Sequence, residues 1–180
     1  WVIIDITSKE RINPMHVLQW IAVKDESVED AFSHVRNNLE SYMDGGTWYD
    51  WFIVGGGRWN ENADNYNDDQ SMVMSFEEDP FISKVDECIE TRIAEFNRYR
   101  QYFNEKNVDL NEVLDRYNGQ MDFSFDLYDL SKMIEMSQGM WDFNSYFFDM
   151  EHHSTNTKYM LDSIASGSVN WYLVPVDFHF

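Results

Sequence analysis

Three consecutive glycines at residues 55–57 follow an apolar run that ends at Val54, and a glycine loop in this position could cradle a phosphate. Dinucleotide and P-loop fingerprints need spaced glycines and a helix that begins directly after them. Here Arg58 and Trp59 follow, and the chain contains no Gly-Lys-Ser/Thr sequence. We therefore expect a tight turn or bulge with at least one positive φ, which holds Trp51 and Trp59 in place and binds no nucleotide.

Side chains with oxygen ligands alternate along the next stretch, as they do in a calcium loop: Asn60, Asn62, Asp64, Tyr66 and Asp68. An EF-hand that starts at Asn60 needs Gly at its sixth position and Glu at its twelfth. The chain has Asn65 and Ser71 there, so a solvated acidic loop is the favoured interpretation.

His152 and His153 lie beside Asp149 and Glu151, a composition that raises the question of a metal. Adjacent residues on a helix point about 100° apart and cannot chelate one ion together, and the chain has no pair of histidines at i and i+4. We expect a surface cluster near a helix end there, a packed or capping role for His34, and neither a metal nor another cofactor.

Nucleophilic catalysis needs an activated serine or cysteine beside a base. The single cysteine, Cys88, falls on the apolar stripe of a predicted helix, where it serves as a small hydrophobic side chain. No Gly-x-Ser-x-Gly sequence occurs. We expect a protein that is not an enzyme. The alternative of this class is an acidic hydrolase that uses paired carboxylates, because 33 acids guarantee accidental pairs.

The net charge is −20, with 33 acidic against 13 basic residues, and residues 25–151 carry the whole excess. A comparable soluble domain needs a magnitude of only about 2–8. Phosphate binding requires Lys and Arg, which argues against nucleic acid or an anionic membrane as a direct partner. The lone cysteine and the absence of a visible signal sequence or long apolar run favour the cytoplasm.

The stretch from Trp59 to Asp79 combines seven acids with aromatic rings and contains no basic residue after Arg58. Charge can steer a basic protein toward such a surface, and the rings can anchor it. We therefore expect this stretch to bind a basic protein through these residues: Trp59, Glu61, Asp64, Tyr66, Asp68, Asp69, Glu77, Glu78 and Asp79.

The sequence Trp-Tyr-Asp-Trp-Phe-Ile-Val-Gly-Gly-Gly-Arg-Trp, residues 48–59, resembles a tryptophan-rich motif of small phage-associated proteins that ends in Gly-Gly-Arg-Trp. The motif itself implies no chemistry and transfers no site residue. The wealth of Asn, Asp, Tyr and Phe is similar to that of early proteins of large staphylococcal phages. Among them, length and acidity resemble the phage inhibitors that bind the primary sigma factor of host RNA polymerase. This resemblance implies a transcription inhibitor that docks on sigma's basic, DNA-reading C-terminal region in the host cytoplasm.

Other functions remain open beside sigma-factor inhibition. An acidic DNA mimic that blocks a restriction or CRISPR nuclease would need carboxylates spaced like phosphates. A structural virion component would assemble with itself. The hydrolase would need a pocket that holds a carboxyl group with a strongly shifted pKa.

Local patterns predict a single α+β domain over residues 1–180, with a mainly antiparallel sheet of about five strands and helices packed on it. Pro175 lacks a backbone donor, which places the last strand at an edge or at a bulge. The expected strands are residues 1–7, 15–23, 48–54, 71–76 and 171–178. The expected helices follow Ser27, begin at Asp79-Pro80 and at Asp109, cover 124–150 with a break near Gly139, and cover 157–165.

Overall fold

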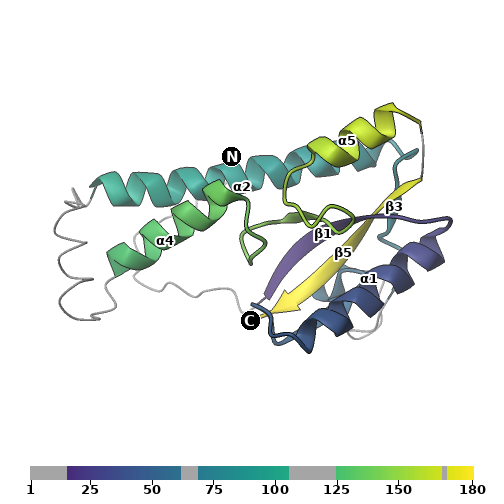
Figure 1. Ribbon diagram of the computed structural model, residues 1–180, viewed down its shortest axis with the longest axis horizontal. Helices are drawn as coiled ribbons and strands as arrows, with labels where there is room; N and C mark the ends of the chain where they lie inside the picture. The colour runs from purple at the N-terminus through teal and green to yellow at the C-terminus, as the bar shows by residue number, and fades with distance from the viewer. Residues whose placement is uncertain (1–15, 62–68, 106–124, 168–169) are drawn as a thin grey trace.

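The computed structural model describes residues 16–61, 69–105, 125–167 and 170–180, which form an α+β fold (Figure 1). The strand expected at residues 1–7 and the helix expected from Asp109 lie outside these ranges. The elements in chain order are β1 (His16–Lys24), α1 (Val28–Met43), β2 (Trp51–Val54), the 3₁₀ turn η1 (Gly57–Trp59), β3 (Met74–Ser75), α2 (Pro80–Glu105), α4 (Phe125–Gln138), β4 (Phe147–Asp149), α5 (Lys158–Ala165) and β5 (Trp171–His179).

The five strands form one mixed sheet in the order β2-β5-β1-β4, with β3 also paired to β5. The central pair is antiparallel, and its register runs from His16 opposite His179 to Lys24 opposite Trp171. Strands β2 and β3 are antiparallel to β5, whereas β4 is parallel to β1. The predicted α+β class with a mostly antiparallel sheet is therefore confirmed.

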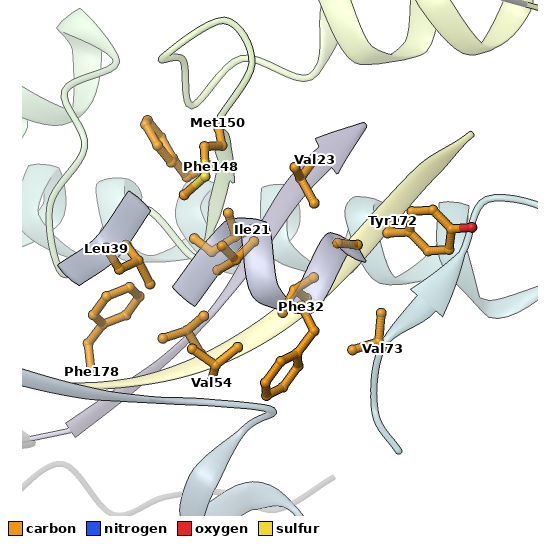
Figure 2. Close-up of a cluster of buried hydrophobic side chains, with 14 of the residues drawn as sticks. Ile21, Val23, Phe32, Leu39, Val54, Val73, Phe148, Met150, Tyr172 and Phe178 are labelled. Carbon is orange, nitrogen blue, oxygen red and sulfur yellow. The ribbon is translucent and has the colours of Figure 1, made fainter. Parts of the chain in front are cut away.

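Each face of the sheet carries its own hydrophobic cluster, because successive strand residues point to opposite faces. Ile21 and Val176 lie on the face covered by α1, and Figure 2 shows Phe32 and Leu39 of that helix in the same cluster. Trp20 and Leu173 belong to the second cluster, to which α2 and α5 contribute. In Figure 1, α1 lies on one side of the sheet, and α2 and α5 lie on the other.

Local signals set the ends of the helices as predicted. Ser27 caps α1, since its hydroxyl accepts a hydrogen bond from the backbone N–H of Asp30 at 3.1 Å. Helix α2 begins at Pro80, a favoured first position. Cys88 of α2 is buried in the second cluster, and burial raises the pKa of its thiol to about 12. It is therefore the inert small hydrophobic side chain that the sequence predicts.

Two sequence predictions about the C-terminal half are wrong. The break expected near Gly139 is present, since α4 ends at Gln138 and Gly139 has a φ of +70°, but residues 147–149 form β4 where the sequence predicted a continued helix. Phe147 and Phe148 belong to the clusters on opposite faces of the sheet, which is the period of a strand. An aromatic run this short is compatible with the period of a helix and with that of a strand. Packing of the two rings into clusters on opposite faces of the sheet stabilises the strand.

Pro175 lies in a central strand rather than at an edge or bulge, directly opposite Trp20 of β1. The backbone N–H that Pro175 lacks would point to the side of β5 that pairs with β2, just beyond the last residue of β2. There the N–H of Gly55 donates to the Pro175 carbonyl at 2.7 Å, and the Gly55 carbonyl accepts from Asn60 Nδ2 at 3.0 Å. The Asn60 amide thus replaces the N–H that proline lacks, and this substitution lets a central strand tolerate the proline.

This replacement can be measured in a double-mutant cycle. Asn60→Ala removes the donor to the buried Gly55 carbonyl, and we expect it to lower the free energy of unfolding by about 1–3 kcal/mol. In that background Pro175→Ala restores an N–H and should recover about 1 kcal/mol, more than the same change yields in the wild-type protein. Urea unfolding of the four proteins tests this, and additivity within about 0.5 kcal/mol would contradict it.

Candidate functional site

The sequence-predicted binding residues fall into two groups along one edge of the sheet. Trp59 is 38% exposed and Glu61 is also exposed, and both follow β2. The exposed acids Glu77, Glu78 and Asp79 lie between β3 and α2. Asp64, Tyr66 and Asp68 lie outside the described residues.

Strands β2 and β3 pair with the same side of β5, one after the other. Trp51 is opposite His179, and Ser75 is opposite Tyr172, so these two positions are separated by roughly 23 Å along β5 at ~3.3 Å per residue. The chain between the two strands therefore leaves the sheet edge opposite Pro175 and returns to it at Met74.

Asp69 stabilises the chain before β3 through its hydrogen bonds. Its carboxylate accepts hydrogen bonds from the Ser71 backbone N–H at 2.6 Å and from Asn60 Nδ2 at 3.2 Å. The pKa of Asp69 is lowered, first by its hydrogen bond with the Ser71 side chain. Although it was predicted as a contact residue, Asp69 holds the chain next to Gly55.

The glycine triplet forms the tight turn that the sequence predicts. The φ angles of Gly55, Gly56 and Gly57 are +97°, +92° and +48°. A Cβ atom at Gly55 would lie 1.9 Å from the Asp69 carbonyl oxygen, and one at Gly57 would lie 2.6 Å from Asp177 Oδ2. Glycine is required here for both backbone conformation and close approach.

The carboxylate of Asp177, which is fully buried in β5, lies beneath this turn. Its Oδ1 is 2.9 Å from His16 Nδ1, and its Oδ2 accepts the Arg58 backbone N–H at 3.3 Å. The Arg58 Nε lies 3.8 Å from the same oxygen. Asp177 therefore ties β5 to β1 and to the turn after β2.

A second histidine–aspartate pair lies beside the first. His179 Nδ1 is 2.5 Å from Asp50 Oδ1, and this hydrogen bond is the main reason why the pKa of Asp50 is lowered. The ring of Trp51 stacks on His179 with a centroid separation of 5.0 Å. The His16 ring meets Trp51 edge-on at 5.0 Å and lies 6.5 Å from Trp59.

We call this group the edge cluster, and its members come from four segments of the chain: His16, Asp50, Trp51, Arg58, Trp59, Asp177 and His179. Sequence reasoning identified Trp59 as a contact residue and missed the others. Asp177 and His179 are two residues apart on one strand and so share a face, which was the available signal. The pairing of Asp177 with His16 spans 161 residues and has no local signature.

The edge cluster combines exposed rings with oriented hydrogen-bonding groups. Trp51 and Trp59 are 36% and 38% exposed, and both indoles lie near His16. The carboxylates of Asp177 and Asp50 accept hydrogen bonds from Nδ1 of the two histidines. The cluster can therefore stack on a flat group and accept hydrogen bonds from it through the exposed carboxylate of Asp50.

A concavity of about 490 Å³ lies at the end of α1, away from the edge cluster residues. Tyr42, Trp48, Trp141, Phe148 and His153 contribute to its walls, and Trp141 stacks on Phe148 at 4.2 Å. These rings also pack against the α1-side core, so this pocket is largely an extension of that cluster.

The histidine pair at residues 152 and 153 follows β4 in a turn rather than near a helix end as predicted. His152 Nδ1 lies 2.8 Å from Oδ2 of the buried Asp149, and the pKa of Asp149 is raised because burial outweighs this hydrogen bond. His34 hydrogen-bonds Asp25 at 3.0 Å. Within residues 16–61, 69–105, 125–167 and 170–180, no group of three or more histidine, cysteine or acidic side chains is placed to hold a metal.

Comparisons with protein-family models, with curated proteins and with solved structures find no match to this chain. In the part of the chain that the structure describes, no helix has the length and apolar character needed to cross a membrane. A function for the chain therefore has to be argued from the geometry and charge of its own residues.

Replacing Asp177 tests its role in the edge cluster. Asp177→Asn removes a buried charge with hydrogen bonds from two segments, and we expect it to lower the free energy of unfolding by about 1.5–3 kcal/mol. The matched control is Asp50→Asn, whose side chain is 63% exposed and whose replacement should lower the free energy of unfolding much less. Equal effects in urea unfolding, or stabilisation by Asp177→Asn, would contradict the assignment.

Proposed function

We propose that the protein binds a basic surface of another protein and that the edge cluster is the centre of the contact. The observation that carries this proposal is the pair of exposed indoles, Trp51 and Trp59, beside the hydrogen-bonded carboxylate of Asp177 in a chain with a net charge of −20. Solvent-exposed tryptophans lose apolar contact with water when a partner covers them.

Rigid aromatic anchors favour binding, because little side-chain freedom is lost in the complex. The stack of Trp51 on His179 restricts one indole. The second indole, Trp59, follows the glycine turn, and the Arg58 guanidinium lies 5.7 Å from its ring centroid. Tryptophan and arginine are the residue types most enriched among those that dominate binding energy.

Charge supplies attraction over a longer range. Glu61 is exposed next to Trp59, and Glu77, Glu78 and Asp79 are exposed farther along the same edge. A standard interface covers about 800 Å² on each partner, which is wide enough to include both groups. Exposed acids at the rim mainly raise the association rate, and salt weakens this effect.

The leading candidate for the partner is the primary sigma factor of host RNA polymerase. Support comes from the resemblance to phage sigma-factor inhibitors and from the basic character of surfaces that read DNA. In this proposal the protein acts in the cytoplasm of the host bacterium. It covers the DNA-reading C-terminal region of sigma and so blocks host transcription.

One observation favours a DNA mimic as the second candidate. Exposed Asp79 lies directly before the first residue of α2, and the exposed Asp86 and Glu90 are four residues apart on one side of this helix. The last two are about 6 Å apart along the helix axis. Such a row of carboxylates suits the nucleic-acid groove of a restriction or CRISPR nuclease.

The acidic hydrolase has weaker support. It would need a protonated carboxyl group that faces a substrate. Asp149 has a raised pKa, yet its side chain is fully buried and hydrogen-bonds His152. This carboxyl group is therefore placed to support the turn after β4.

Surface plasmon resonance against purified sigma factor at two salt concentrations tests the proposal. We expect Trp59→Ala to speed dissociation by an amount equal to about 1–2 kcal/mol, because it removes an anchor. Glu77→Lys combined with Glu78→Lys should slow association and flatten its salt dependence. Tyr159→Ala is the matched aromatic control, since this ring is 56% exposed on α5. Failure of the wild-type protein to bind would remove sigma as the partner, and equal effects of the two ring variants would move the interface elsewhere.

A further inference from the structure

We infer that the edge cluster recognises an arginine side chain of the partner. This inference rests on the proposed binding to a basic protein and adds to it the chemical group that is read. It follows from which atoms of the cluster donate hydrogen bonds, which accept them, and where the indole rings lie around His16.

The two aspartates determine what the histidines present to a ligand. His16 donates through Nδ1 to Asp177, and His179 donates through Nδ1 to Asp50. In an imidazole ring the two nitrogens point in widely different directions, so each Nε2 is directed away from its aspartate. The rings of His16 and His179 are 4.9 Å apart at an interplanar angle of 77°. The His179 side chain is 21% exposed and the His16 side chain is 9% exposed, so a ligand reaches His179 more readily than His16.

The indoles add flat apolar surface beside these histidines. His16 lies close to both Trp51 and Trp59, and each of these indoles remains more than one-third exposed. A planar cation that binds at these indoles can therefore contact rings whose faces carry negative electrostatic potential. The intramolecular approach of Arg58 to Trp59 at 5.7 Å is already a contact of this kind.

The charges of the cluster favour a cation. Asp50 is 63% exposed and its pKa is lowered, so it stays ionised at neutral pH. The charge of Arg58 is offset by the buried carboxylate of Asp177, 3.8 Å from its Nε. An anion would meet the ionised carboxylate of Asp50 and the net charge of −20, whereas a guanidinium ion meets an acceptor and an attractive field.

Arginine fits better than lysine for geometric reasons. Its guanidinium group is planar, stacks on aromatic rings and holds five N–H donors in a fixed fork. The acceptor beside the indoles is the exposed carboxylate of Asp50, whose two oxygens match such a fork. The ammonium group of lysine has no flat face to stack between Trp51 and Trp59.

The test uses hexa-arginine and hexa-lysine peptides with the full chain, and it follows the indole and imidazole signals by NMR. We expect saturable shifts of Trp51, Trp59 and both histidines with hexa-arginine at pH 7.5. Trp51→Ala should weaken this binding about tenfold. Asp50→Asn, which alters an exposed side chain, should weaken it several-fold. The matched control is Asp162→Asn, because Asp162 is 64% exposed on α5.

Three results would overturn the inference: hexa-lysine that binds as tightly as hexa-arginine, equal effects of the two aspartate substitutions, or adenosine monophosphate that shifts the same signals in place of the peptide. The outcome is separable from that of the proposed function. Sigma binding unaffected by Trp51→Ala would refute only the arginine site, and peptide binding without sigma binding would refute only the partner.

Discussion

The buried carboxylate of Asp177 is the interaction on which the edge of the sheet depends. Removing a carboxylate from water costs several kcal/mol unless its oxygens are well paired. Here His16 of β1 and the backbone and side chain of Arg58 supply the partners. Gly57 has no side chain, which allows the turn to approach Asp177 this closely. The Asp177 carboxylate in β5 therefore holds β1 on one side of the strand and the glycine turn after β2 on the other side.

Recognition follows from the same constraint. The turn that wraps Asp177 ends at Trp59, and β2 begins with Trp51 beside His179, so both exposed indoles are held by the elements that the carboxylate joins. The surrounding excess of acids destabilises the folded chain by self-repulsion but attracts a basic partner. In the proposed complex, the acids attract the partner at long range and the edge cluster contacts it.

Local chemistry made part of this fold predictable from the sequence. The Ser27 cap, the helix start at Pro80 and the positive φ angles of the glycine triplet each depend on neighbouring residues. The predictions for Pro175 and β4 are wrong because both depend on groups that are distant in the sequence. The Asn60 amide replaces the N–H that Pro175 lacks. Phe147 and Phe148 pack into hydrophobic clusters on opposite faces of the sheet, which stabilises a strand. Of the candidate site, the sequence indicated Trp59. The histidine–aspartate pairs require the register of β5 with β1 and β2, which no local pattern encodes.

The most direct test of this account is the tautomer of the two histidines. Long-range ¹H–¹⁵N correlation spectra of the imidazole rings at pH 7.5 distinguish a protonated Nδ1 from a protonated Nε2. With the aspartates as acceptors, His16 and His179 should both carry a proton on Nδ1. A ring that carries its only proton on Nε2 would contradict the central claim that Asp177 and Asp50 hold the two histidines of the edge cluster through Nδ1.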